Sequence, residues 1–318
     1  MEKQRIVVAI GGNALQSDTH DASAQSQLAF ARETARPIGD LIAEGHEIII
    51  VHGNGPQVGQ ILSVFEKTSD MPVMPLPESV AMSQGYIGYH LQQAIGDEAR
   101  RRGFNKNVVT VLTQVKIDRN DETLGHPTKP IGSFYSREDA EELARQNGFV
   151  MIEDAGRGWR RVVDSPKPVE IVESDAIRSL IEEGHVVIAS GGGGVPVNIQ
   201  DNGQLHGVAA VIDKDWAAER LAELLNADYL IILTGVDRVA INYRKSNQRE
   251  LGVVTSSEAK QYVREGQFEP GSMLPKVSAA IRFVESKPGR RALITSIDKA
   301  KEAMLGTTGT TFVTTIAP

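Results

Sequence analysis

The sequence contains no cysteine, which excludes disulfide-stabilised folds, thiolate metal sites and cysteine nucleophiles. It also lacks any apolar run that approaches the roughly 20 residues of a membrane-spanning helix. The apolar run at residues 6–10 is too short for the core of a signal peptide and is typical of a buried strand. These absences lead us to expect a cytoplasmic protein that does not associate with a membrane.

Basic residues are in the minority, with 34 Lys and Arg against 41 Asp and Glu, and the formal net charge is −7. This balance argues against a nucleic-acid-binding protein, because such proteins concentrate positive charge on one face. The seven histidines are scattered, and none forms the pair at four-residue spacing that is typical of a zinc site on a helix. We therefore expect neither a nucleic-acid partner nor a transition-metal centre.

Two familiar nucleotide-binding motifs are missing as well. The Walker motif requires Gly-Lys followed by Ser or Thr, and the chain has no Gly-Lys dipeptide. The dinucleotide motif G-x-G-x-x-G is also missing, since Gly53, Gly55 and Gly59 have the wrong final spacing. If the protein binds a nucleotide, it does so without either loop.

What the chain does contain is an alternation of short β-branched runs with longer segments of helical periodicity. Several runs are almost wholly apolar, which is typical of parallel strands covered by helices on both faces. The predicted strands are residues 6–10, 47–51, 108–112, 186–189, 229–233, 292–295 and 312–315. The predicted helices are residues 26–44, 56–67, 78–102, 174–183, 216–225, 257–265 and 276–286.

This order predicts an α/β protein, a three-layer α/β/α sandwich around a mostly parallel central sheet. The 318 residues suit one large domain. Residues 119–168 are polar and rich in Gly and Pro, and we interpret them as an insertion that protrudes from the sheet. Within residues 195–208, Asp201-Asn202-Gly203 between short alternating runs predicts a β-hairpin.

Glycine-rich junctions follow four of the predicted strands, at residues 11–13, 53–55, 191–194 and 234–237. Ligands of an open parallel sheet bind beyond the carboxyl ends of its strands, where glycine lets backbone N–H groups approach an anion. At a single junction, glycine could equally serve a tight turn. Four consecutive glycines are harder to explain in that way, because each one forgoes packing. The joint pattern indicates a site for phosphate or another compact anion.

Three lysines lie in unusual backbone surroundings. Lys129 stands between two prolines, Lys214 lies between Asp213 and Asp215, and Lys276 stands at the predicted start of a helix. The carboxylates beside Lys214 could orient its ammonium group or bind a metal ion. Each lysine alone could be an ordinary surface residue. Together they could supply the positive charge that phosphoryl transfer requires.

Read together, these segments resemble the carbamate kinases of the amino-acid-kinase superfamily. The resemblance extends in order over essentially the whole chain, and some of its segments are shared with the wider superfamily. Pro-Thr-Lys-Pro-Ile-Gly at 127–132 and Gly-Trp-Arg-Arg at 158–161 are particular to the carbamate kinase branch. The segments that carry the resemblance are 8–15, 52–59, 127–132, 158–163, 211–215 and 271–276.

The resemblance implies an eight-stranded, mainly parallel sheet, a protruding subdomain at about 119–168 and a homodimer. It implies a carbamoyl-phosphate lobe over about 1–210 and a nucleotide lobe over about 211–318. The implied reaction transfers a phosphoryl group between carbamoyl phosphate and ADP, giving ATP and carbamate, which breaks down to ammonia and carbon dioxide. Mg²⁺ would enter mainly on the nucleotide phosphates. In fermenting bacteria such enzymes make ATP from arginine through the arginine deiminase route.

Carried over by position, Lys129 would reach carbamoyl phosphate from the subdomain, and Lys214 and Lys276 would flank the transferred phosphoryl group. Asp215 would organise these lysines. No general base is required, because carbamate is already an anionic nucleophile. The expected donors of backbone or amide hydrogen bonds to the anion are Gly11, Gly12, Asn13, Gly53, Asn54, Gly191, Gly192 and Gly193. The expected residues of the nucleotide pocket are Thr234, Asp237, Asn242, Tyr243 and Met273.

The chain departs from the family pattern at Ala209, where glutamate is usual, and at Ser133, where proline is common. Two alternatives stay open. Another kinase of the same fold, such as an acetylglutamate or nucleoside-monophosphate kinase, would need room for a larger acceptor and would leave Lys129 unexplained. A non-catalytic sensor would bind nucleotide or carbamoyl phosphate without turnover.

Overall fold

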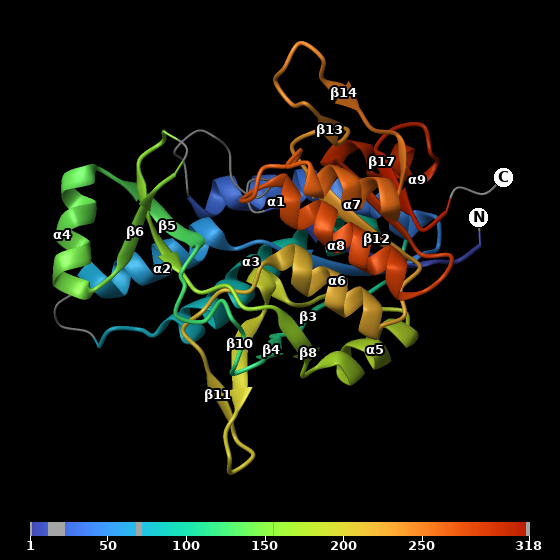
Figure 1. Ribbon diagram of the computed structural model, residues 1–318. Coiled ribbons are helices and arrows are strands. Elements are labelled where there is room, and N and C mark those ends of the chain that lie inside the picture. The colour runs from blue at the N-terminus through green and yellow to red at the C-terminus, as the bar shows by residue number, and fades with distance from the viewer. Residues whose placement is uncertain (1, 12–22, 68–71, 155, 316–318) are drawn as a thin grey trace.

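The computed structural model describes residues 2–11, 23–67, 72–154 and 156–315 (Figure 1). The helices are α1 (Ala24–Ala43), α2 (Gly55–Lys67), α3 (Leu76–Arg101), α4 (Arg137–Asn147), α5 (Ser174–Glu182), α6 (Lys214–Leu224), α7 (Ser256–Arg264), α8 (Met273–Ser286) and α9 (Ala300–Met304), with 3-10 turns η2 (Gly191–Gly193) and η3 (Ile297–Lys299). The strands are β1 (Arg5–Ile10), β2 (Glu47–His52), β3 (Val108–Thr110), β4 (Gln114–Ile117), β5 (Lys129–Tyr135), β6 (Val150–Glu153), β7 (Trp159–Val163), β8 (Pro168–Ile171), β9 (Val186–Ile188), β10 (Val195–Ile199), β11 (Leu205–Gly207), β12 (Tyr229–Thr234), β13 (Ala240–Ile241), β14 (Arg249–Glu250), β15 (Val253–Thr255), β16 (Arg291–Ser296) and β17 (Thr310–Val313).

The central sheet has eight strands in the order β15-β17-β16-β12-β1-β2-β9-β3. Every neighbouring pair in it is parallel except β16 with β17. The seven predicted strands all lie in this sheet, and the prediction of a mostly parallel α/β fold is confirmed. The eighth strand, β15, was not predicted.

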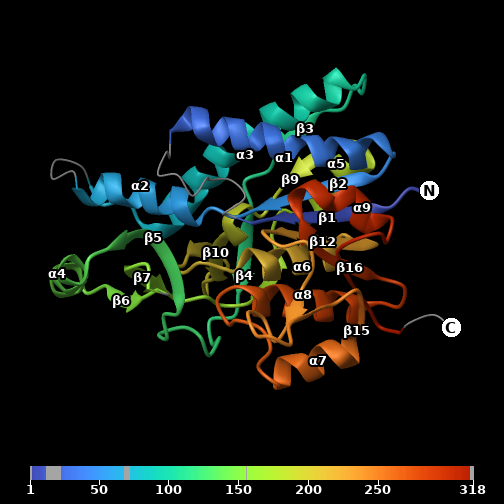
Figure 2. The ribbon, with the colours of Figure 1, turned by 90° about the horizontal axis from the view of Figure 1, so that it is seen from above.

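The sheet is covered on both faces, and β1 shows how its sequence requires this. Ile6, Val8 and Ile10 point into a core cluster shared with α1 and α3. Val7 and Ala9 point to the opposite face, into a cluster shared with α5, α6 and α8. All five side chains are fully buried, and burying each large one stabilises the fold by roughly 1.5–3 kcal/mol. Figure 2 shows the resulting layers, with α1 and α3 on one side of the strands and α6 and α8 on the other.

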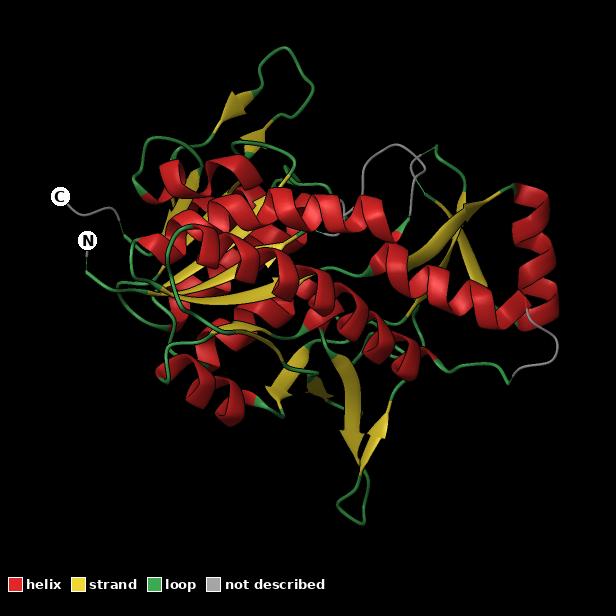
Figure 3. Cartoon of the chain, turned by 180° about the vertical axis from the view of Figure 1, so that it is seen from behind, coloured by secondary structure: helices red, strands yellow, loops and turns green. Residues whose placement is uncertain are grey.

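Among the described residues, three smaller sheets accompany the central one, and the smallest only pairs β13 with β14 (Figure 3). The first has the order β11-β10-β4-β8, and its antiparallel β10–β11 pair is the predicted hairpin. The second has the order β5-β7-β6 and is joined by α4, all within the segment that we interpreted as an insertion. Its bounds as a subdomain, and the division of the chain into two lobes, stay predictions.

The three-stranded sheet rests on α2 through a contact between two glycines. A Cβ atom on Gly59 of α2 would lie 2.1 Å from the Cα of Gly132 in β5. The backbones of α2 and β5 could therefore not lie this close together if residue 59 had a side chain. Gly132 also has a φ of +75°, which disfavours any other residue. Arg161 of β7 adds an ion pair to Glu66 of α2, with 3.0 Å between nitrogen and oxygen. The three-stranded sheet therefore packs on α2 through both a close backbone contact and an ion pair.

The predicted helices are all present, with ends that differ by a few residues. One difference bears on the site: α8 begins at Met273, so Lys276 lies within its first turn and does not open the helix as predicted. The stripe formed by Val277, Ala280, Ile281 and Val284 is buried, as its spacing requires. None of the helices in the described segments is long and apolar enough to cross a membrane.

Candidate active site

A cluster of lysines and aspartates lies where α6 and α8 begin. Asp215, in the first turn of α6, accepts hydrogen bonds from two ammonium groups, one on each of its oxygens. Lys214 Nζ lies 2.6 Å from Oδ1, and Lys276 Nζ lies 3.0 Å from Oδ2. Because Lys276 stands on α8, the carboxylate joins the two helices at their N-terminal ends.

The cluster is nearly closed to solvent. The Asp215 side chain is 3% exposed, and those of Lys214 and Lys276 are 12% and 13% exposed. Burial alone would raise the pKa of Asp215, but the charges and hydrogen bonds of the two lysines hold it below its usual range. Burial lowers the pKa of Lys214, and the neighbouring Asp215 carboxylate opposes that shift. The carboxylate is therefore ionised, and two ammonium groups face it.

The third predicted lysine reaches the same place from the three-stranded sheet. Lys129 is the first residue of β5, and its Nζ donates a hydrogen bond to Asp213 Oδ2. Asp213 is the N-cap of α6, because its Oδ1 accepts from the backbone N–H of Asp215 at 2.8 Å. The structure thus brings together Lys129, Lys214, Asp215 and Lys276 from three separate segments.

The glycine run after β9 forms a tight loop against this cluster. Ser190, Gly192 and Gly193 have φ values of +50°, +67° and +96°. A Cβ on Gly192 would lie 2.1 Å from the side-chain nitrogen of Asn54, and one on Gly193 would lie 2.1 Å from the carbonyl oxygen of Ile212. The glycines are therefore required by close packing as well as by backbone conformation.

Not all of the expected backbone donors are free in this structure. The N–H groups of Gly11, Gly53 and Gly193 donate to the carbonyl oxygens of Leu233, Ile10 and Ser190, at 3.3, 3.0 and 2.9 Å. Within the described segments, the N–H groups of Gly191 and Gly192 have no such acceptor. The two N–H groups are thus available to a ligand in this structure, and the donor roles of all the expected residues stay predictions. Gly12 and Asn13 lie outside the described residues.

The side chains around the loop differ in whether they have hydrogen-bond partners among the described residues. Asn54 Nδ2 donates to Ser83 Oγ at 2.8 Å, so this amide is already engaged. His52 Nδ1 donates to the Gly53 carbonyl oxygen at 3.0 Å, which leaves the buried Nε2 an acceptor that no described residue satisfies. Burial lowers the pKa of His52 to about 4, so the ring is neutral at physiological pH. Ser190 Oγ is likewise buried without a partner among the described residues.

The expected nucleotide-pocket residues are spread over β12, the turns that follow it and the start of α8. Thr234 ends β12, and Met273 packs on the core cluster beneath α8. Asn242 has a φ of +52°, and its N–H donates to Gln267 Oε1 at 2.9 Å. Asp237 and Tyr243 are exposed, with no hydrogen bond or ion pair to the lysine cluster within the described segments. Their nucleotide role stays a prediction.

Sequence reasoning missed two parts of the site. It placed Asp213 beside Lys214, whereas the structure pairs this carboxylate with Lys129. The predicted helix began at residue 216, so the N-cap signal of an aspartate just before a helix favoured Asp215 and not Asp213. It also missed Gln84, whose side-chain amide forms hydrogen bonds with both the N–H and the carbonyl oxygen of Thr113. Thr113 Oγ1 in turn accepts a hydrogen bond from the N–H of Ser190 at 2.8 Å.

The donor set suits an anion better than a directly bound metal ion. Both oxygens of Asp215 already accept from lysines, and Asp213 is shared between Lys129 and a helix cap. Over the described residues, no group of three acidic or histidine side chains gathers in a way that could hold a metal. A role for Mg²⁺ on the phosphates of a bound nucleotide stays a prediction.

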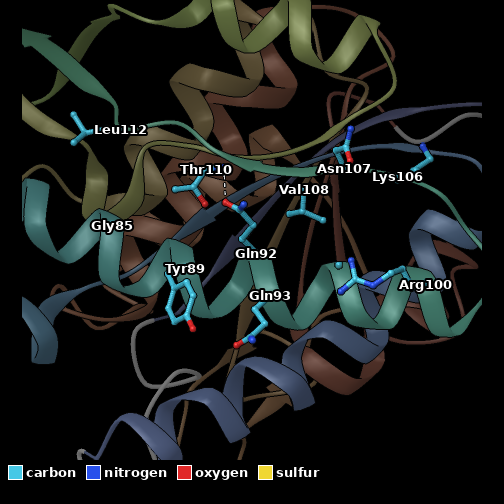
Figure 4. Close-up of a pocket in the computed structure, with 11 residues that line it drawn as sticks. Gly85, Tyr89, Gln92, Gln93, Arg100, Lys106, Asn107, Val108, Thr110 and Leu112 are labelled. Carbon is cyan, nitrogen blue, oxygen red and sulfur yellow. Dashed lines mark hydrogen bonds between the residues drawn. The ribbon is translucent and has the colours of Figure 1, made fainter.

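A separate surface cavity of about 560 Å³ lies at the edge of the central sheet (Figure 4). It is lined by α3 and by residues of and around the edge strand β3, and it contains none of the cluster lysines. Gln92 of α3 points to β3, where its Oε1 accepts from the N–H of Thr110 at 3.1 Å. Tyr89 and Leu112 at its rim are 61% and 52% exposed.

Comparison with known proteins places this fold and cluster in a family. The model of the amino acid kinase family matches residues 4–296, and the chain belongs to that family. The carbamate kinase of Clostridium perfringens is 53% identical over 313 residues, which cover 97% of this chain and 99% of that protein. This identity places the chain in the carbamate kinase branch.

Two further matches agree with that placement. The carbamate kinase-like protein YqeA of Escherichia coli is 51% identical over 311 residues, covering 96% of this chain and 98% of that protein. The structure of carbamate kinase from Giardia lamblia bound to AMP-PNP superposes with a TM-score of 0.90 at 40% identity, covering 98% and 99% of the two chains.

Proposed function

We propose that this protein catalyses reversible phosphoryl transfer between carbamoyl phosphate and ADP, giving ATP and carbamate. The observation that carries the proposal is the convergence of Lys129, Lys214 and Lys276 on two aspartates in one nearly enclosed cluster. Phosphoryl transfer depends mainly on positioning and on neutralising charge at the transferred group. The relatives of this chain at about half identity are carbamate kinases.

The residues act on the reaction as positioned cations. The bond from phosphorus to the carbamate oxygen breaks as a bond forms to an oxygen of the ADP β-phosphate. Lys214 and Lys276 donate hydrogen bonds to the phosphoryl oxygens, and Asp215 keeps both ammonium groups in place. Lys129 donates to carbamoyl phosphate from the three-stranded sheet. Carbamate leaves as an anion, so no side chain needs to move a proton, and it then breaks down to ammonia and carbon dioxide.

The anion and nucleotide sites lie on opposite sides of the lysine pair in this proposal. The N–H groups of Gly191 and Gly192, which have no backbone acceptor among the described residues, donate to carbamoyl phosphate. Gly11, Gly53 and Asn54 donate as well where they exchange their present partners. The nucleotide lies over Thr234, Asp237, Asn242, Tyr243 and Met273. Mg²⁺ bound to its phosphates supplies further charge neutralisation.

The proposal is tested by ATP formation from ADP, Mg²⁺ and carbamoyl phosphate in a coupled assay, with Lys129→Ala, Lys214→Ala and Lys276→Ala alongside. We expect turnover by the parent and kcat losses of about 100-fold or more in the variants of Lys214 and Lys276. Binding of ADP without turnover by the parent would instead support a sensor, and Ala209→Glu, which restores the family residue, would then be assayed. Turnover of a larger acceptor would identify another kinase of this fold.

We further infer that the protein works as a cytoplasmic homodimer, with ATP synthesis from arginine as its setting. The surface that we assign to the second copy is the face of α3 and β3 around the cavity of Figure 4. Tyr89 and Leu112, which line the cavity, are 61% and 52% exposed, and Met82 on the same helix is 43% exposed. β3 is also an edge strand of the sheet, and edge strands of native proteins are usually covered.

A further inference from the structure

The two carboxylate oxygens of Asp213 have different partners. Oδ1 accepts from the backbone N–H of Asp215 at 2.8 Å and so caps α6, the helix that carries Lys214. Oδ2 accepts from the ammonium of Lys129, which lies 84 residues earlier in the chain. The Asp213 side chain therefore caps α6 and also binds Lys129 of the three-stranded sheet.

The backbone just before Asp213 pairs with Asp164, the residue that follows β7 of the three-stranded sheet. The N–H of Val211 donates to the carbonyl oxygen of Asp164 at 3.0 Å, and Ala210 forms a parallel bridge with Asp164. Thr128, just before Lys129, donates to the carbonyl oxygen of Val163 at 3.0 Å. These contacts bring the first residue of β5 within reach of α6. The Lys129–Asp213 ion pair adds a charged contact between β5 and the start of α6.

The position of the pair suits a lysine that must be ready before substrate arrives. The Lys129 side chain is 31% exposed and the Asp213 side chain 13% exposed, so the ammonium lies at the mouth of the cluster. An ammonium group has three N–H donors, and one of them is used by Asp213. The remaining two can meet an anion without breaking the pair. Ordering a long side chain in advance removes that entropic cost from substrate binding.

We propose that Asp213 is a positioning residue that holds Lys129 toward the phosphoryl site while it caps α6. Asp213 touches no substrate in this scheme and acts through Lys129. The inference rests on the proposed carbamate kinase reaction, in which Lys129 binds carbamoyl phosphate. It goes beyond that reaction by assigning a role to a carboxylate that the reaction itself does not require.

The test is Asp213→Asn, because asparagine keeps an oxygen for the helix cap and loses the charge that pairs with Lys129. We expect the KM for carbamoyl phosphate to rise about tenfold, the KM for ADP to stay unchanged, and the melting temperature to stay near that of the parent. In a Lys129→Ala background, Asp213→Asn should cause no further loss. An equal loss with and without Lys129 would overturn the proposal, since it would show that Asp213 acts by another route.

A second measurement does not depend on turnover. Amide hydrogen exchange of β5 and β7 in the ligand-free protein should be faster in Asp213→Asn than in the parent, because the tether to α6 is lost. Unchanged exchange there would overturn the proposal. If Asp213→Asn does not fold, Lys129→Gln breaks the same pair from the other side and is read by exchange in the same way.

The matched control is Glu66→Gln, which removes the ion pair between Arg161 and α2. Like the Lys129–Asp213 pair, the Arg161–Glu66 pair connects the three-stranded sheet to a neighbouring helix. Neither Arg161 nor Glu66 belongs to the lysine cluster. We expect no change in the KM for carbamoyl phosphate; a tenfold rise in this variant too would overturn the specific role of Asp213. A parent protein that shows no turnover would contradict the proposed function, while hydrogen exchange would still decide whether the tether exists.

Discussion

Lys276 Nζ lies 3.0 Å from Asp215 Oδ2, and the other oxygen of the same carboxylate lies 2.6 Å from Lys214 Nζ. Two cations therefore share one anion, and the group as a whole keeps an excess positive charge. Because Asp215 is almost completely buried, its carboxylate has little access to water as an alternative partner. The arrangement keeps two ammonium groups ordered and still attractive to phosphate.

Replacing Asp215 by Asn should damage both activity and stability. The neutral amide leaves two largely buried ammonium groups without their anion, so we expect the free energy of unfolding to fall by about 3–5 kcal/mol. We expect kcat to fall by about 100-fold or more, because the lysines lose their fixed positions. Urea unfolding and the coupled ATP assay measure the two effects.

The control for this variant is Asp201→Asn. Asp201 pairs with Arg119 in the hairpin turn, but its side chain is 99% exposed. An exposed pair contributes little, so its removal should change the free energy of unfolding by less than about 0.5 kcal/mol. Similar losses from both substitutions would contradict the special role of Asp215.

Gly192→Ala should disrupt the anion loop. The new Cβ would lie 2.1 Å from Asn54 Nδ2, and the residue would have to keep a φ of +67°. We expect a loss of about 1–3 kcal/mol in the free energy of unfolding, together with a large loss of kcat/KM for carbamoyl phosphate. Chemical unfolding and steady-state kinetics measure these changes.

Gly203→Ala separates backbone strain from the loss of the loop. Gly203 has a φ of +83°, yet a Cβ there meets no atom within 4 Å. Gly203→Ala should introduce about as much backbone strain as Gly192→Ala, but it should leave kcat/KM for carbamoyl phosphate unchanged. If Gly192→Ala keeps parental kcat/KM, the loop does not need its close packing on Asn54.

Much of the fold could be predicted because burial on both faces leaves a plain sequence signal. The runs that become β1 and β2 are apolar at almost every position, and the structure buries both. The short strand β15 gave no such signal, since it has three residues and Val253 is 57% exposed. Its place in the sheet depends on pairing with β17, which a local pattern cannot reveal.

The site was predictable in part for a related reason. Lys129, Lys214 and Lys276 stood out by their local surroundings, but their partners depend on how distant segments meet. Lys129 and Asp213 are 84 residues apart, and nothing in either segment specifies the other. The hydrogen bond from the Gly53 N–H to the Ile10 carbonyl oxygen could not be predicted either, because it depends on the register between β1 and β2.

Leu112→Glu should prevent dimer formation if the face of α3 and β3 is the contact between two copies. A buried, unpaired carboxylate in such a contact is costly, so we expect the mass in solution to fall to that of one chain. Size-exclusion chromatography with light scattering measures it. Leu205→Glu is the matched control, since Leu205 is 39% exposed on the hairpin strand β11. A dimeric Leu112→Glu protein, or a monomeric parent, would contradict this assignment.

Glu219 gives the stability of the protein a defined dependence on pH. It lies on α6 one turn after Asp215, is 1% exposed, and has one oxygen without a hydrogen-bond partner among the described residues. Its other oxygen lies 3.3 Å from Arg282 Nε on α8. Burial raises the pKa of Glu219 from 4.5 to about 7, and the charge of Arg282 opposes this shift without overcoming it.

The sign of the effect follows from proton binding. Between pH 4.5 and about 7, the folded protein holds a proton on Glu219 that the unfolded chain has released. The free energy of unfolding therefore falls as pH rises through this range, by about 3 kcal/mol at most from this group. Glu219→Gln removes the titration, so its stability relative to the parent should be higher at pH 8 than at pH 5. Urea unfolding at both pH values measures the difference, with Glu170→Gln, a half-exposed carboxylate, as control. An equal difference at the two pH values would show that Glu219 is already ionised in the folded protein at pH 5, held so by Arg282.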